Sequence, residues 1–135
     1  FINQVVLIDY TIIILGGEYM SEYKSEENWL NNAPLTVVDV DSLHFCLEYR
    51  SVEVYGQEIQ LTAKEFDILA LLILNPRRVF TYEMIADIVW KEEYNEYSRK
   101  AINNHISNLR KKLKVTPDIP NYIKSVHSVG YKFDV

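Results

Sequence analysis

The sequence predicts an α+β fold with an N-terminal four-stranded antiparallel sheet, three helices and a C-terminal β-hairpin. Two observations lead to this prediction. Short runs rich in β-branched and aromatic residues fill positions 35–61, whereas apolar residues recur at helical spacing between positions 62 and 114. A second strand-like stretch follows Pro117 and Pro120, which cannot continue a helix.

Four strands are predicted in the sheet, at residues 36–40, 43–49, 52–55 and 58–61. Turn sequences at Asp41-Ser42, at Arg50-Ser51 and at Gly56 separate them, so an antiparallel meander is the simplest arrangement. Val52 and Val54 alternate with Glu53, which indicates that one face of the sheet is buried and the other is wet.

The first two helices are predicted from their capping residues. Thr62 and Glu65 form a capping box at the start of the first helix, and Asn75-Pro76 ends it. The second helix begins at Thr81 and ends near Trp90. Its side chains expected to be buried are Ile85, Ile88 and Val89.

The third helix is predicted from near Ser98 to about Lys114, after a loop at residues 91–97 that has no apolar period. One narrow apolar stripe is expected to anchor it to the core, formed by Ile102, Ile106, Leu109 and Leu113. Residues 122–126 and 130–135 then form the hairpin.

Residues 1–34 are predicted to be an N-terminal extension or linker, and residues 35–135 the folded domain. The apolar run at residues 5–15 is far shorter than the roughly 20 residues of a membrane-spanning helix, so we expect a strand or a buried turn of helix there. Gly16-Gly17-Glu18 is what a purine-rich ribosome-binding sequence before an ATG would encode. We therefore hypothesise that residues 1–19 are translated leader and that the natural chain starts at Met20.

The net charge of −5 conceals an uneven distribution along the chain. Residues 1–75 carry 3 basic and 12 acidic side chains, whereas residues 76–135 carry 11 basic and 7 acidic ones. Within residues 98–114 there are six Lys or Arg residues and no Asp or Glu. A solvated helix ordinarily mixes both signs, because opposite charges four residues apart stabilise it. The third helix therefore indicates an anionic partner, and we expect double-stranded DNA.

Short amide side chains lie among these cations. Asparagine can bond N6 and N7 of adenine together in the major groove, and Asn104 and Asn108 point away from the apolar stripe. Lys100, Arg110 and Lys111 suit phosphates, which supply affinity but carry no sequence information. The alternative is a basic surface helix that only keeps the domain soluble.

A helix, a connector, a basic helix and a hairpin form the layout of a winged helix-turn-helix. Five segments in this order and spacing carry a further resemblance: Val54-Tyr-Gly56 with Ile59-Gln-Leu-Thr-Ala-Lys-Glu-Phe66, Val79-Phe-Thr81, Val89-Trp90, Ala101-Ile-Asn-Asn-His-Ile-Ser-Asn-Leu-Arg-Lys-Lys-Leu113 and Val129-Gly-Tyr-Lys-Phe133. Residues 35–135 thus resemble the OmpR/PhoB-type effector domains of bacterial response regulators.

The resemblance implies that the third helix enters the major groove and that the hairpin, the wing, reaches the neighbouring minor groove. The residues predicted to bind DNA are Arg99, Lys100, Asn103, Asn104, His105, Ser107, Asn108, Arg110, Lys111, His127 and Tyr131. It also implies two further partners, RNA polymerase at the loop 91–97 and a tandem second copy on DNA. Many relatives have an arginine in the recognition helix where this chain has Ser107 and Asn108, and Arg-Gly at the wing tip where this chain has His127-Ser128. The base preference of this chain therefore need not follow theirs.

We therefore predict a sequence-specific DNA-binding transcriptional regulator of the two-component type, cytoplasmic and without enzymatic activity or a receiver domain. The alternative is a winged-helix protein-interaction module whose acidic sheet and linker are the working surface. No cofactor, metal site or membrane contact is expected. His44, His105 and His127 lie on separate elements, and Cys46 is the only cysteine. No Gly-rich phosphate loop or catalytic triad occurs in the sequence.

Overall fold

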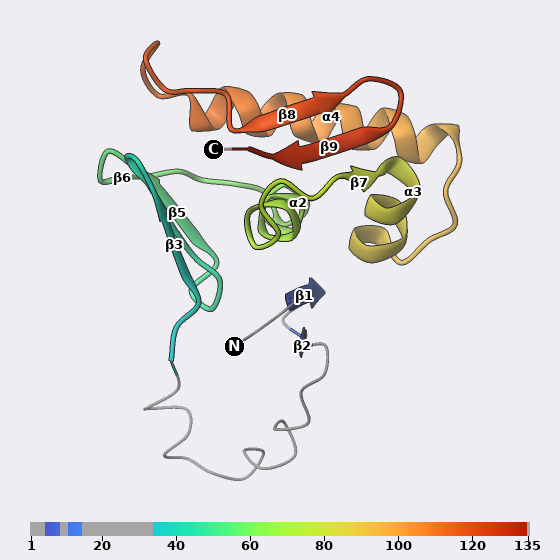
Figure 1. The fold of residues 1–135 in the computed structure, drawn as a ribbon, viewed down its shortest axis with the longest axis horizontal. Coiled ribbons are helices and arrows are strands. Elements are labelled where there is room, and N and C mark those ends of the chain that lie inside the picture. The colour runs from blue at the N-terminus through green and yellow to red at the C-terminus, as the bar shows by residue number, and fades with distance from the viewer. Residues whose placement is uncertain (1–4, 9–10, 15–33, 135) are drawn as a thin grey trace, which may run out of the picture.

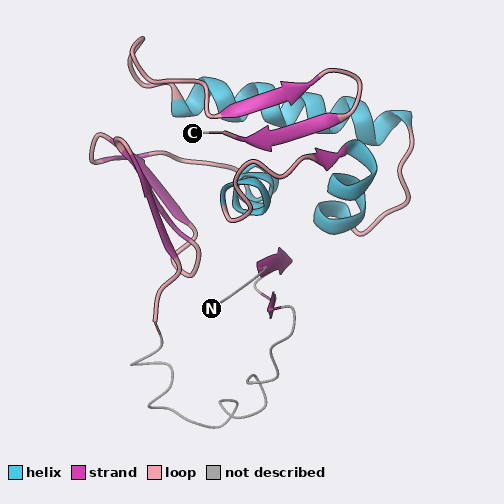
Figure 2. Cartoon of the chain, viewed as in Figure 1, coloured by secondary structure: helices cyan, strands magenta, loops and turns pink. Residues whose placement is uncertain are grey.

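The computed structural model describes residues 5–8, 11–14 and 34–134. Figure 1 shows the order of the elements and Figure 2 their types. The strands are β1 (Val5–Ile8), β2 (Thr11–Ile14), β3 (Val37–Val40), β4 (Leu43–Cys46), β5 (Ser51–Val54), β6 (Gln57–Glu58), β7 (Phe80–Thr81), β8 (Ile123–Val126) and β9 (Gly130–Phe133). The helices are α2 (Ala63–Ile73), α3 (Tyr82–Ile85), the π-helical turn η2 (Ala86–Trp90) and α4 (Glu96–Leu113).

The N-terminal segment differs from the single element expected for the apolar run. β1 and β2 pair antiparallel, with Val5 opposite Ile14 and Ile8 opposite Thr11. Residues 15–33, which hold most of the predicted linker and the end of the hypothesised leader, lie outside the described residues. Among the described residues, none of the helices combines the length and apolar character needed to cross a bilayer.

The predicted four-stranded meander is present, in the order β3-β4-β5-β6 with every pair antiparallel. Its inner face contributes Leu43, Phe45, Val52 and Val54 to the core. β4 ends earlier than predicted because residues 47–50 form a tight turn, in which the Arg50 amide donates to the Leu47 carbonyl at 3.0 Å. The sheet lies at one end of the molecule (Figure 1).

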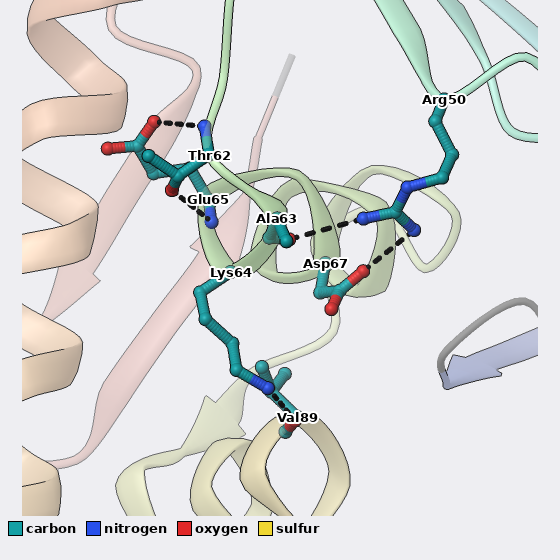
Figure 3. A network of polar contacts seen from close by, with 7 residues as sticks. All are labelled: Arg50, Thr62, Ala63, Lys64, Glu65, Asp67 and Val89. Atoms are coloured by element: carbon teal, nitrogen blue, oxygen red, sulfur yellow. Dashed lines mark hydrogen bonds and ion pairs between the residues drawn. The ribbon is translucent and has the colours of Figure 1, made fainter.

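Helix α2 begins at the predicted capping box. The Thr62 hydroxyl accepts from the Glu65 amide at 3.2 Å, and the Glu65 carboxylate accepts from the Thr62 amide at 2.9 Å (Figure 3). Glu65 is only 2% exposed, and Lys112 of α4 donates to the same carboxylate at 2.7 Å. This ion pair joins the start of α2 to the end of α4.

Two further cations attach α2 to its neighbours (Figure 3). Arg50 lies 2.9 Å from the Asp67 carboxylate, and its guanidinium sits 4.5 Å from the centre of the Phe66 ring. Lys64 donates to the carbonyl of Val89 at 3.0 Å, at the end of η2. The helix that contributes more residues to the core than any other element is therefore held from the sheet side and from the α3–η2 side.

The second helix begins at Thr81 as predicted, where the threonine hydroxyl accepts from the Met84 amide. It continues as the π-helical turn η2 and stops at Lys91, whose φ of 57° is left-handed. Ile85 and Val89 are buried as expected, whereas Ile88 is half-buried at the edge of the core.

Helix α4 starts at Glu96, two residues before the predicted start. Asn95 accepts from the Ser98 amide at 3.0 Å, and Ser98 accepts from the Asn95 amide at 3.1 Å. This reciprocal cap makes Ser98 part of the first turn rather than the residue before it. The stripe predicted to anchor the helix is buried, with Ile102, Ile106 and Leu109 fully enclosed.

The predicted C-terminal hairpin is part of a larger sheet. β9 pairs with β8 on one side and with β7 on the other, so the order is β7-β9-β8. Gly130 lies opposite Thr81 where β9 pairs with β7, and a Cβ atom there would lie 1.9 Å from the Phe80 carbonyl oxygen. No side chain fits at this contact, so Gly130 lets the wing lie directly against β7, the strand that leads into the second helix.

Replacing Gly130 by alanine is expected to destabilise the domain, because backbone atoms of β7 must move to admit the methyl group. We expect the free energy of unfolding to fall by about 1–3 kcal/mol, the usual cost of overpacking. Chemical denaturation measures this change. Val129→Ala, at the exposed neighbouring position, is the matched control, and equal stability of the two variants would contradict the close approach.

Glu65 is expected to make stability depend on pH. Burial raises its pKa, but the hydrogen bonds from Lys112 and the Thr62 amide outweigh burial and hold the pKa below its ordinary value of 4.5. A lowered folded-state pKa means that the stabilisation is present above the unfolded-state pKa and is lost as the pH falls through the folded-state pKa. Glu65→Gln should therefore cost about 1–3 kcal/mol at neutral pH and progressively less below pH 4.5.

Denaturation curves at several pH values test this expectation. Glu58→Gln, which alters an exposed carboxyl on β6, is the matched control and should cost less than about 0.5 kcal/mol. A cost of Glu65→Gln that stays constant as the solution is acidified would show that the carboxylate charge does not stabilise the fold.

Candidate nucleic-acid interface

One face of α4 is exposed along most of its length, opposite the buried stripe. Its residues are cations and short polar side chains that alternate without a carboxylate: Lys100, Asn104, Ser107, Asn108 and Lys111. All five were predicted to bind DNA, and the structure places them together on this face, which we call the outer face of α4. A surface of this kind can donate to phosphates and can both donate to and accept from base edges.

Tyr97 extends the outer face beyond what the sequence predicted. It is 86% exposed and lies in the first turn of α4, seven residues before Asn104 and therefore on the same side of the helix. The prediction missed it because residues 91–97 were assigned to a loop. The Asn95-x-x-Ser98 spacing was the signal in the sequence, since asparagine is among the best N-capping residues.

The wing presents its turn to solvent. His127 and Ser128 are exposed between β8 and β9, and Ser128 has a left-handed φ of 63°. The hairpin runs along α4 (Figure 1), and Arg110 fastens the two elements together. Its guanidinium donates to the Ile123 carbonyl at 2.7 and 3.1 Å and to the Ser125 hydroxyl at 2.9 Å.

Asn103 and Tyr131, both predicted to bind DNA, meet in a cluster behind the outer face. The Asn103 amide oxygen accepts from the Tyr131 hydroxyl at 2.6 Å and from the Tyr82 hydroxyl at 2.9 Å. Tyr131 is 6% exposed, and burial, followed by the neighbouring Tyr82, raises its pKa to about 12. The cluster joins α4, which carries the outer face, to α3 and β9 beside it.

Arg99 and Arg110 lie over the two rings of this cluster. The Arg99 guanidinium is 4.6 Å from the centre of the Tyr82 ring, and that of Arg110 is 5.3 Å from the centre of the Tyr131 ring. The rings meet edge to face at 5.7 Å. Of the two arginines, Arg99 is exposed and Arg110 is half-buried with its donors engaged, so their availability to a ligand differs.

His105 and Lys112 lie on the other flank of α4. The His105 ring is half-buried and packs 5.5 Å from the centre of the Trp90 ring at the end of η2. Lys112 is paired with Glu65, as described above. The structure therefore places His105 in the contact between the second helix and α4, to one side of the outer face.

The loop before α4 is shorter than predicted and spans residues 91–95. Glu92 and Glu93 are exposed in it, while Tyr94 packs against the edge of the core. Glu96, the third acidic residue of the predicted loop, is instead the first residue of α4. Two carboxylates thus remain at the free surface of this loop.

Negative charge is concentrated on the four-stranded sheet. Asp39, His44, Glu53 and Glu58 stand opposite one another on successive strands and form a single row on its outer side. Within the described part of the chain, no group of three or more His, Cys, Asp or Glu side chains is arranged to hold a metal ion. The acidic sheet and the basic helix are thus separate surfaces of one domain.

Comparisons with known proteins agree with this geometry. Residues 56–133 match the model of a family described as "Transcriptional regulatory protein, C terminal". An uncharacterized transcriptional regulatory protein of Bacillus subtilis, YcbL, is 37% identical over 112 residues, which are 83% of this chain and 47% of the relative. The chain thus spans about half the length of that relative.

Two solved structures share the fold. The DNA-binding domain of CpxR from Escherichia coli superposes with a TM-score of 0.65 at 29% identity, covering 73% of this chain and 96% of that one. The DNA-binding domain of RstA from Klebsiella pneumoniae, solved in complex with the RstA box, has a TM-score of 0.64 at 25% identity and covers 73% and 97%. Since the family model matches more than half of the chain, this protein belongs to the family of C-terminal domains of transcriptional regulatory proteins, the OmpR/PhoB-type winged-helix effector domains of response regulators.

Proposed function

We propose that this domain binds double-stranded DNA sequence-specifically and thereby regulates transcription. The observation that carries the proposal is the outer face of α4, where cations and amides stand together with no carboxylate between residues 98 and 114. Lys100 and Lys111 stand exposed on this face, and phosphate oxygens would supply partners for them. The family is one of DNA-binding regulatory domains rather than of enzymes.

The side chains of this face divide into two roles. Lys100 and Lys111 are exposed and would contact phosphates, which set the register of the helix on the duplex. Asn104 and Asn108 are exposed between them and would reach base edges in the major groove. Tyr97 would lie at the edge of the groove, and His127 on the wing would face the neighbouring minor groove. The related DNA-binding domain of RstA was solved in complex with the RstA box, which supports DNA binding by a domain of this fold.

The proposed partners beyond DNA rest on single features. Glu92 and Glu93, exposed in the loop before α4, would suit a protein surface such as that of RNA polymerase. A second copy bound in tandem is the other proposed partner. A regulatory role of the two-component type would follow from the relatives, of which the chain spans about half.

A protein-interaction module is the second candidate function. It is favoured by the row of acidic residues on the outer side of the four-stranded sheet, Asp39, Glu53 and Glu58. Salt separates the two candidates, because DNA binding through several phosphates weakens steeply as salt is added. A shallow salt dependence, or no binding to any duplex, would favour the interaction module.

Lys111→Ala is expected to reduce the salt dependence of DNA binding. Each phosphate contact contributes about 0.9 to the slope of log K against log salt, so the slope should become shallower by about one. Fluorescence anisotropy at several salt concentrations measures it. Asp39→Asn, which removes one charge from the sheet, is the control and should leave the slope unchanged. An unaltered slope in Lys111→Ala would show that this lysine does not face a phosphate.

Asn104→Ala and Asn108→Ala are expected to relax base preference. A bidentate contact to a base discriminates by about 1–3 kcal/mol, whereas non-specific affinity rests on the cations and should change little. Selection from a randomised duplex pool, followed by competition with non-specific DNA, measures both quantities. A uniform loss of affinity across sequences would mean that these amides contact only the backbone.

A further inference from the structure

The two hydrogen bonds that Asn103 accepts use up its amide oxygen. Tyr82 and Tyr131 approach this oxygen from two different elements, at 2.9 and 2.6 Å. An amide oxygen has two lone pairs, and each now receives one hydroxyl proton. The oxygen is therefore not free to accept a hydrogen bond from a ligand.

The orientation of the amide follows from the surroundings of the two hydroxyls. The cations nearest the rings, Arg99 and Arg110, carry only donors and can offer the hydroxyls no acceptor. Burial keeps the Tyr131 hydroxyl protonated far above neutral pH. Turning the amide over would place N–H groups against both hydroxyls, and at most one of the two hydroxyl protons could then be donated to the oxygen of the other tyrosine. The oxygen accordingly faces the tyrosines.

The amide nitrogen is left with its two N–H donors. It has no hydrogen-bond partner within the described part of the chain. It is also not one of the fully buried polar atoms that lack a partner there. Asn103 is half-buried on α4, one turn from both Lys100 and Ser107 of the outer face. The donors thus lie beside the surface that would meet DNA.

We propose that Asn103 is a specificity-determining residue that acts only as a hydrogen-bond donor and selects guanine over adenine. This inference rests on the proposed DNA binding. Adenine presents one acceptor and one donor in the major groove, so its pairing with asparagine needs the amide oxygen as well as the nitrogen. Guanine presents two acceptors, N7 and O6, which two N–H donors can satisfy. The tyrosines therefore leave Asn103 only its N–H donors with which to contact a base.

Asn104 and Asn108 provide the contrast within the same helix. Both are exposed, and neither amide is engaged by a hydroxyl pair of the kind that holds Asn103. Their amides can rotate to present both a donor and an acceptor, which suits adenine. Three asparagines in one helix would thus read two different bases, because only one of them is held by tyrosines.

Selection from a randomised duplex pool tests the proposal directly. Wild-type protein should enrich guanine at one position of the binding site. Asn103→Asp should lose this enrichment, with a drop in guanine preference of about tenfold. Aspartate has the same shape and still accepts from both hydroxyls, but it has no N–H to donate. Thermal unfolding confirms that the variant is folded.

Removing both tyrosine hydroxyls should let the protein accept adenine, a gain of binding that loss of structure cannot produce. In the double variant Tyr82→Phe with Tyr131→Phe the amide is free to rotate, and adenine should be accepted at the position where wild type requires guanine. Tyr82→Phe alone keeps the Tyr131 hydrogen bond and should keep guanine. Tyr55→Phe is the matched control, because it removes a hydroxyl bonded to Asp118 outside this cluster.

The outcomes distinguish this inference from the function on which it rests. Failure of wild-type protein to enrich any duplex would overturn the proposed function and this inference with it. A wild-type site whose base preferences are unchanged in Asn103→Asp would overturn this inference alone. So would an adenine preference at the affected position, or a loss that is uniform over all positions and marks a phosphate contact.

Discussion

The burial of one apolar stripe of α4 against α2 is the contact on which the rest of the structure depends. Ile102, Ile106 and Leu109 are fully enclosed, and each buried side chain of this kind contributes about 1.5–3 kcal/mol. Repulsion between like charges on the other side of the helix costs only a few tenths of a kcal/mol per pair. The hydrophobic contact is therefore large enough to hold a helix that carries six cations and no carboxylate between residues 98 and 114. A chain with a net charge of −5 can in this way present a basic surface.

Polar contacts on the flanks of α4 determine how that helix is rotated and what lies beside it. Lys112 is paired with buried Glu65 on one flank, and Arg110 is bonded to the carbonyl of Ile123 in the wing on the other. These cations hold the domain together, whereas Lys100 and Lys111 remain exposed on the outer face. Residues of one chemical type in one helix thus divide into structural and surface roles.

The asparagines of α4 likewise divide into one that is bonded within the domain and others that are exposed on the outer face. Asn103 contacts two tyrosines from α3 and β9, and Asn104, the next residue, is exposed. A one-residue step rotates the side chain by about 100° around the helix, which carries it from the contact with the wing to solvent. The close pairing of β9 with β7 at Gly130 brings β9 near enough to α3 for both tyrosines to reach the same amide oxygen. The path of the wing backbone therefore determines which hydrogen-bonding groups of Asn103 on α4 are already engaged within the domain.

The sequence by itself determined the strands of the meander, the three helices and the hairpin, together with the capping box at Thr62 and the buried stripe of α4, because each depends on the pattern of residues close by in the chain. It also identified the basic helix and, through spaced motifs, the family. Only the tertiary structure decided that β7 joins the hairpin, that Arg110 fastens the wing and that the Asn103 oxygen is occupied. These contacts join residues 13 to about 50 positions apart, whose meeting depends on how the whole chain packs. Local periodicity carries no information about which of two exposed-looking polar residues will find a buried partner.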